Sequence, residues 1–178
     1  MAYGKQWKNI GMKIGITGHQ KFDNNDTYSW VRSSIQNELN SIEPPLIGYT
    51  SLAIGSDQIF ATLIYENGGT VYALIPFINY ERAFEKKDIF LYKKLLNKAK
   101  EIETLSIKGT DEDSYLEAGK RIVDKSDIII AVWNNKPAEG KGGTADIVNY
   151  ARRKNRPLII INPEGRTIIR SNFNKKRP

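Results

Sequence analysis

The chain has 178 residues, no cysteine, one histidine and a formal net charge of +7. This length is typical of one domain with its own core. The lack of cysteine excludes disulfides, cysteine-based zinc sites and a thiol nucleophile, and one histidine excludes a histidine cluster. We therefore predict no metal site and no cofactor. No apolar run is long enough to span a membrane and no signal-peptide pattern is present, so we expect a cytoplasmic protein without a membrane partner.

Much of the positive charge lies near the C-terminus. Five basic residues and no acidic residue follow position 165, which leaves a net charge of +2 for residues 1–165. Such a nearly balanced body does not favour a nucleic-acid partner, because nucleic acids attract basic surfaces. We expect a flexible lead-in over residues 1–12, a single domain over 13–163 and a solvated basic tail over 164–178.

Short apolar runs alternate with helical patterns along the chain. Strands are predicted over 13–17, 46–54, 70–75, 102–105, 127–133 and 158–161. Between them, apolar residues at helical spacing predict helices around 30–39, 59–64, 89–99, 115–123 and 147–151, the first with Asp26 or Thr27 as N-cap. This alternation predicts an α/β fold of three layers, with a mostly parallel sheet of about six strands and helices on both faces.

One stretch combines a buried strand, a glycine-rich loop and a helix start. The strand Asp127–Asn134 is followed by Gly140–Asp146, where Gly142, Gly143 and Thr144 open a helical pattern. Backbone N–H groups of such a loop and of the first helical turn bind phosphate readily. The alternative is an ordinary strand-to-helix turn in which the glycines only supply positive φ angles.

Ligands of parallel sheets bind at the carboxyl ends of the strands, so residues that follow a strand are the candidates for a site. The candidates are Gly18, His19, Gln20, Gly55, Ser56, Asp57, Phe77, Glu81, Arg82, Trp133, Asn134, Gly142, Gly143, Thr144 and Asp146. His19 could donate a hydrogen bond or carry a proton near pH 7, or be an ordinary loop histidine. Ser56 and Asp57 could cap the second helix or bind ligand. Arg82 could bind an anion or pair with Glu81 or Glu85.

These residues together resemble the SLOG (SMODS and LOG-like) superfamily. The resemblance runs from residue 13 to about residue 163, and its carriers are Gly15–His19, Gly55–Asp57, Ile75–Phe77, Lys125–Ile130 and Gly142–Thr144. The superfamily includes LOG-like nucleotide phosphoribohydrolases, DprA-like proteins and sensor domains of some bacterial antiphage systems. The resemblance implies a Rossmann-like fold that binds a nucleotide or nucleotide-derived signal, often as a homo-oligomer. A GxGxxG fingerprint and a Walker motif are both missing, so neither a nicotinamide cofactor nor NTP hydrolysis is supported.

The chain departs from the phosphoribohydrolase pattern GGxGTxxE at its last position. Ile147 stands where those enzymes have glutamate, and the acidic residue is Asp146, one position earlier. One residue rotates a side chain by about 100° around a helix. This favours a sensor or sequestering protein over an enzyme. In such a protein the phosphate would be held by Gly142, Gly143, Thr144 and Ser56, with Arg82 as the counter-ion. The ribose hydroxyls would be bound by Asp146 or Asp57, and the base would be covered by Trp133 or Phe77. The alternative is an N-glycosidase of nucleoside 5′-monophosphates with Asp146, Asp57 or Glu81 as the catalytic carboxylate.

Overall fold

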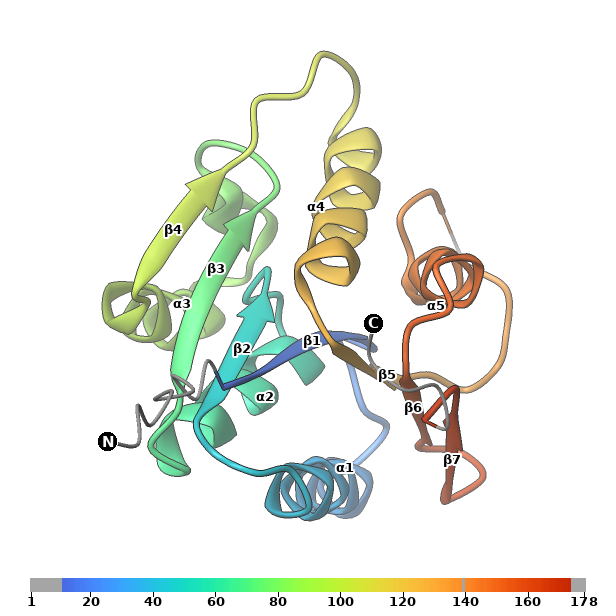
Figure 1. Ribbon diagram of the computed structural model, residues 1–178. Helices are drawn as coiled ribbons and strands as arrows, with labels where there is room; N and C mark the ends of the chain where they lie inside the picture. The colour runs from blue at the N-terminus through green and yellow to red at the C-terminus, as the bar shows by residue number, and fades with distance from the viewer. Residues whose placement is uncertain (1–10, 139, 174–178) are drawn as a thin grey trace, which may run out of the picture.

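The computed structural model describes residues 11–138 and 140–173, and its centre is a seven-stranded sheet (Figure 1). The strand order is β4-β3-β2-β1-β5-β6-β7. Strands β1 to β6 pair in parallel, and β7 is antiparallel to β6. The bounds are β1 (Met12–Gly18), β2 (Leu46–Thr50), β3 (Thr70–Ile75), β4 (Glu101–Thr104), β5 (Ile128–Val132), β6 (Leu158–Asn162) and β7 (Thr167–Ser171).

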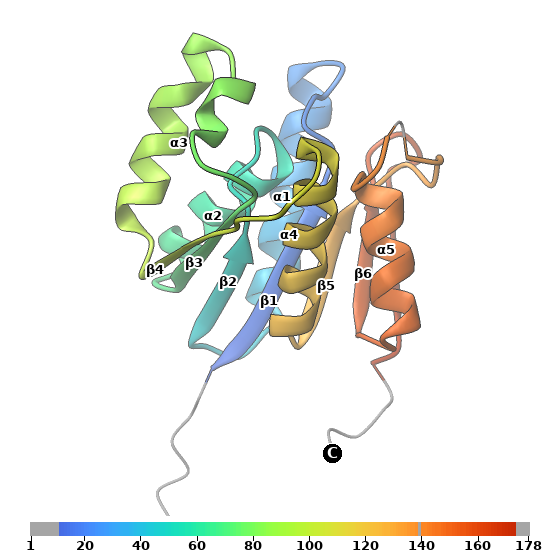
Figure 2. The same ribbon diagram turned by 90° about the horizontal axis from the view of Figure 1, so that it is seen from above.

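Helices cover both faces of the sheet (Figure 2). One face carries α1 (Asn25–Asn40), α2 (Ser56–Glu66) and α3 (Lys86–Lys98), and the other carries α4 (Asp111–Lys125) and α5 (Thr144–Arg153). A short 3₁₀ helix, η1 (Tyr80–Ala83), follows β3. The predicted three-layer α/β fold is thus confirmed, with one strand more than expected. No helix in the described part of the chain is long and apolar enough to cross a membrane.

The strand order reverses between β1 and β5, and ligands of such sheets bind where this reversal occurs. The chain builds outward from β1 through β2 and β3 to β4, and then returns to place β5 on the other side of β1. The loops after β1 and β5 therefore leave the sheet in opposite directions, which opens a crevice at their carboxyl ends.

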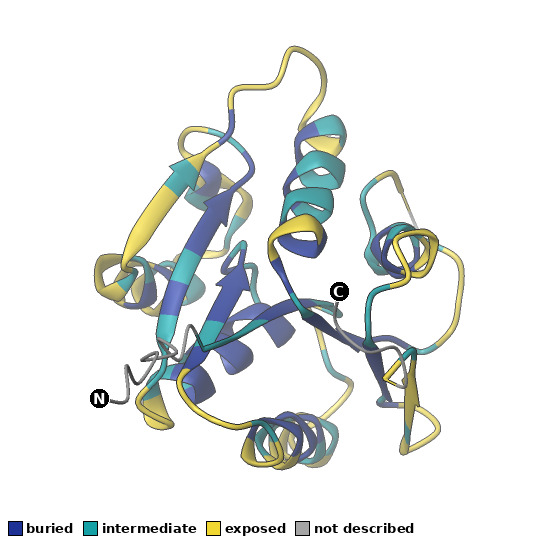
Figure 3. Ribbon diagram, viewed as in Figure 1, coloured by how far each residue is buried: buried dark blue, intermediate teal, exposed yellow. Residues whose placement is uncertain are grey.

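The centre of the sheet is buried and mostly apolar. All five residues of β5 are buried, as are Ile14 and Ile16 of β1 (Figure 3). Strands buried on both faces carry continuous β-branched runs rather than alternating patterns. The edge strands β4 and β7 are largely exposed.

Strand β7 lies in the segment expected as a tail, and ion pairs join it to α1. The Arg170 guanidinium binds the carboxylate of Glu38, with Nε donating to Oε2 over 2.9 Å. At the turn before β7, Arg166 pairs with Asp26 over 2.6 Å and lies over the Trp30 ring at 5.3 Å. The strand escapes detection in the sequence because its exposed edge position requires no apolar run.

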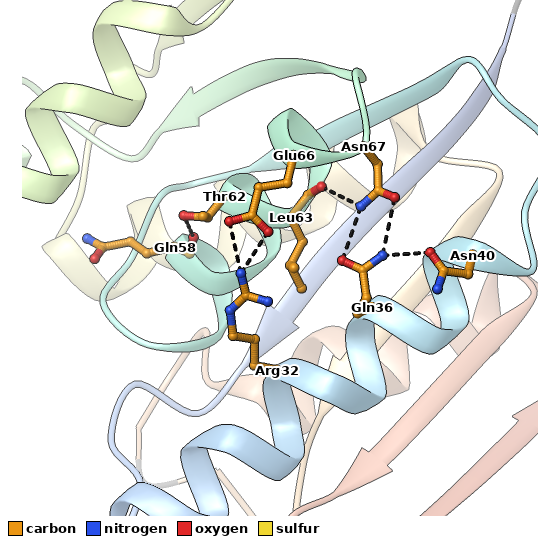
Figure 4. A network of polar contacts seen from close by, with 8 residues as sticks. All are labelled: Arg32, Gln36, Asn40, Gln58, Thr62, Leu63, Glu66 and Asn67. Carbon is orange, nitrogen blue, oxygen red and sulfur yellow. Dashed lines mark hydrogen bonds and ion pairs between the residues drawn. The ribbon is translucent and has the colours of Figure 1, made fainter.

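Polar side chains also align α1 with α2 (Figure 4). Arg32 donates to both carboxylate oxygens of Glu66 over 2.9 and 2.7 Å, and Gln36 exchanges two hydrogen bonds of 3.2 Å with Asn67. Exposed pairs of this kind contribute little stability but specify how two helices lie together.

Two predicted boundaries are wrong. The N-cap of α1 is Asn24, whose Oδ1 accepts a hydrogen bond of 2.8 Å from the Thr27 N–H, instead of Asp26 or Thr27. Strand β2 ends at Thr50 instead of Ile54, since Leu52 adopts a positive φ of 57° that a strand cannot accommodate.

Candidate functional site

A cavity of about 600 Å³ lies at the carboxyl ends of β1 and β5, where the order of the strands predicts a binding site. Its walls come from the loops after β1, β2, β3 and β5 and from the facing ends of α4 and α5. Ligand sites for small molecules commonly have this size. The structure brings nine of the predicted residues into the wall: Gly18, His19, Gln20, Asp57, Trp133, Asn134, Gly142, Gly143 and Thr144.

Gly55 and Ser56 lie outside the lining and instead hold the loop that carries His19. The Ser56 N–H and hydroxyl both donate to the His19 carbonyl, over 3.1 and 2.7 Å. Gly55 has a φ of +82°, and a Cβ there would lie 2.4 Å from the Gln20 carbonyl oxygen. Only glycine allows this approach of two backbones, so the pair positions the wall of the cavity.

Asp57 is a buried carboxylate at the floor of the cavity. It is 6% exposed, and its Oδ2 accepts hydrogen bonds from the Thr50 hydroxyl over 2.7 Å and the Ser51 N–H over 3.0 Å. Burial raises the pKa of Asp57 to about 6, although these hydrogen bonds oppose the shift. The N-cap of α2 is Gly55, so the interpretation of Ser56 and Asp57 as caps is wrong.

The glycine-rich loop is shaped by Asp146, whose carboxylate bends back onto it. Oδ2 of Asp146 accepts a hydrogen bond of 2.9 Å from the Gly142 N–H. Gly142 has a φ of +84° and approaches α4 so closely that a Cβ would lie 2.6 Å from the Leu116 nitrogen. Asp146 is not part of the cavity lining, whereas Ile147, although only 2% exposed, is part of it.

The N-terminus of α5 faces the cavity without a side-chain cap. Its N-cap is Gly143, which has no side chain to accept from the first turn, and Thr144 and Ala145 line the cavity. The first N–H groups of a helix have no partner within the helix and carry its positive partial charge. The cavity thus contains donors arranged for an anion.

Basic side chains that the sequence interpretation missed line the same cavity. Lys21, Lys136 and Lys141 line the cavity, against Glu112 as the exposed acid in the wall. Lys136 also pairs with Glu164 over 2.9 Å, and Lys141 pairs with Asp113. Lys141 could have been predicted as a site residue, because it lies in the sequence inside the glycine-rich loop.

His19 belongs to a polar cluster at the rim of the cavity. Its side chain hydrogen-bonds to Asn134, whose Nδ2 donates to Glu164 over 2.7 Å. Burial lowers the pKa of His19, which keeps the imidazole neutral at pH 7. A neutral imidazole acts as a hydrogen-bond donor or acceptor rather than as a counter-charge.

Aromatic residues also line the cavity. Tyr80 and Tyr115 line the cavity, while Phe77 lies behind them with ring centroids 5.4 and 5.6 Å away. Trp133 also lines the cavity, and its Nε1 donates to the Lys136 carbonyl over 2.8 Å. Phe77 thus supports the wall, and Trp133 anchors the loop that follows β5.

Glu81 and Arg82 do not reach this cavity. Both lie on η1, and neither side chain is part of the lining. The described residues contain no group of three or more histidine and acidic residues that could hold a metal ion.

Comparison with known proteins shows a shared fold. No protein-family model and no curated protein matches the chain. It is similar to DNA processing protein A from Helicobacter pylori, with a TM-score of 0.57 and 15% identity over 84% of this chain and 65% of that one. The Streptococcus pneumoniae protein of the same name gives 0.55 and 15% over 84% and 50%. The structural-genomics target TM1055 gives 0.53 and 14% over 83% and 72%.

The chain thus spans 65% and 50% of the two DNA processing proteins. At these identities the likeness shows the fold alone. All three comparisons agree with a Rossmann-like sheet.

Proposed function

We propose that the protein binds a phosphorylated small molecule of nucleotide size in this cavity, as a sensor or sequestering protein of the SLOG type. The observation that carries the proposal is the uncapped start of α5, which opens into the cavity that Lys136 and Lys141 also line. An anion at a helix N-terminus gains about 0.3–1 kcal/mol from the helix dipole, and charge-assisted hydrogen bonds add to this.

The aromatic part of the lining suits the uncharged part of such a ligand. Tyr80 and Tyr115 provide aromatic surface, and Ser51 and Asp57 contribute oxygen atoms to the lining. A ligand with its phosphate at α5 and a flat ring near Tyr115 would use both the N–H donors and the aromatic surface. This arrangement supports a nucleotide over inorganic phosphate.

Hydrolysis of an N-glycosidic bond is the second candidate, and one residue favours it. Asp57 lies in the cavity, and burial raises its pKa to about 6, which is within the range of a general acid or base. Against it, Asp146 is bound to its own loop, and Ile147 occupies the position of the enzymes' glutamate. We therefore place binding ahead of catalysis.

A thermal-shift screen with chromatography of the same samples tests both candidates. The panel contains a nucleoside, its 5′-monophosphate, ADP-ribose, a cyclic dinucleotide and inorganic phosphate. A ligand present at about 100 times its Kd stabilises the folded state by about 2.7 kcal/mol, or roughly 5–10 °C for a domain of this size. Ligand recovered intact supports binding, and release of free base supports the hydrolase.

Variants locate the site within the same screen. Thr144→Val removes a hydroxyl from the lining, and Lys136→Met removes a charge. Each should reduce affinity for the phosphorylated ligand roughly tenfold, because a hydrogen bond to a charged group contributes about 1.5–3 kcal/mol. Lys154→Met is the control, since Lys154 lies beyond the far end of α5 and pairs with Asp124 over 3.8 Å. A shift shared equally by nucleoside and nucleotide would refute the anion site.

A further inference from the structure

The outer face of α3 carries an exposed phenylalanine among four lysines. Phe90 is 78% exposed. Two lysines precede the ring by four and three residues, Lys86 and Lys87. Two more follow it by three and four residues, Lys93 and Lys94. All four lysines are exposed. Residues at these spacings share one side of a helix, so the lysines flank the ring along the helix.

This segment carries a local excess of basic residues. Five lysines against Glu85 and Asp88 give residues 85–98 a net charge of +3, whereas residues 1–165 together carry +2, so the rest of that range carries −1. Among the ion pairs of the described residues, Lys87 with Glu85 at 3.0 Å is the pair that involves the four lysines. The nearly balanced total therefore conceals a local basic surface.

The fold leaves this face uncovered. Helix α3 packs against α2 and buries Tyr92 and Leu95, and it lies at the outside of its layer (Figure 2). A single exposed apolar residue is common on protein surfaces. An aromatic ring with lysines on both sides is a more specific combination, because bases stack on such rings while lysines bind the phosphates next to them.

We propose that the outer face of α3 is a docking surface for single-stranded nucleic acid, with a base stacked on Phe90 and phosphates bound by the lysines. The lysines before and after Phe90 are seven residues apart, which is about 10 Å along a helix. That span holds one nucleotide with a phosphate on each side. Every base has a face that can stack, so binding tolerates any sequence.

The outer face of α3 is less suited to bind an anionic membrane. A helix that lies in a membrane surface needs an apolar stripe along its length. On α3, Tyr92 and Leu95 point into the protein and Leu91 is 38% exposed, so Phe90 is the apolar side chain that stands mostly in solvent. One ring does not form a stripe.

Fluorescence anisotropy of the full chain with a labelled 20-nucleotide oligo(dT) tests the proposal. Phe90→Ala should weaken binding about tenfold, and Phe90→Trp should restore it, because stacking depends on an aromatic face. Replacement of Lys93 and Lys94 by glutamine should lower the slope of log K against log salt by about 0.7, because these two lysines bind the one phosphate that follows the stacked base. Oligo(dA) should behave like oligo(dT), and a duplex should be insensitive to Phe90→Ala because its base faces are covered.

Matched controls separate this surface from the tail and from the cavity. Phe173→Ala removes another exposed phenylalanine, and Lys108→Gln with Lys120→Gln removes two charges elsewhere; both should leave stacking-dependent binding intact. Unchanged melting temperatures verify folding. Absence of binding at low salt, equal binding by Phe90→Ala, or loss of binding only in Thr144→Val would each overturn the proposal. Phe90-dependent sedimentation with phosphatidylserine vesicles, without oligonucleotide binding, would assign the face to a membrane instead.

Discussion

Replacement of Asp57 by asparagine tests the assignment of a buried, titrating carboxyl group at the cavity floor. Burial raises the pKa of this group from its usual 3.8 to about 6. Between these two pH values the folded protein keeps a proton that the unfolded chain has lost, so the contribution of Asp57 to stability falls as the pH rises. The gap corresponds to about 3 kcal/mol.

Urea unfolding followed by circular dichroism gives this quantity directly. The difference in unfolding free energy, wild type minus Asp57→Asn, should fall by about 3 kcal/mol between about pH 3 and about pH 7 and then remain level. Hydrogen bonds altered by the amide shift the whole curve but not its slope. Asp23→Asn, at an exposed loop position, is the control for removal of one charge. A difference that is flat or that rises with pH would refute the burial argument.

Two further substitutions test the parts that hold the cavity and the last strand. Arg170→Met leaves the buried carboxylate of Glu38 without its cation. The substitution should therefore reduce the free energy of unfolding in urea by about 1–3 kcal/mol. Recovery of stability in the double variant with Glu38→Gln would confirm the cause, and an unchanged stability of Arg170→Met would contradict this account. Gly142→Ala places a Cβ 2.6 Å from the Leu116 nitrogen, whereas Gly68→Ala, also at positive φ, meets open space. Gly68→Ala should cost about 1 kcal/mol and Gly142→Ala more, with weaker nucleotide binding in Gly142→Ala alone. Equal losses in a melting experiment would contradict the close approach.

The fold could be predicted from the sequence because its central strands are short β-branched runs that alternate with helical patterns. A run such as Ile128–Val132 is typical of a strand buried on both faces, and the alternation with helices favours a parallel sheet. Strand β7 could not be predicted, since Thr167–Ser171 is mostly exposed and pairs through its backbone. Its ion-pair partners on α1 lie far away in the sequence.

The candidate site was predictable where a residue directly follows a strand. His19 and Asn134 follow β1 and β5 and do line the cavity. Tyr115 was missed because it belongs to α4 and was interpreted as the first residue of a helical pattern that suggested packing alone. Asp146 appeared as a ligand-binding residue because spacing does not reveal that its carboxylate binds the Gly142 N–H.

Amide chemical shifts in a ¹⁵N-labelled sample test the central claim most directly. On titration with a nucleoside 5′-monophosphate, the account predicts the largest shifts at the N–H groups of Gly143, Thr144 and Ala145, which begin α5, with smaller shifts at His19. The corresponding nucleoside should leave the α5 amides nearly unchanged. Shifts of equal size with nucleoside and nucleotide, or shifts confined to other surfaces, would contradict an anion site at the start of α5.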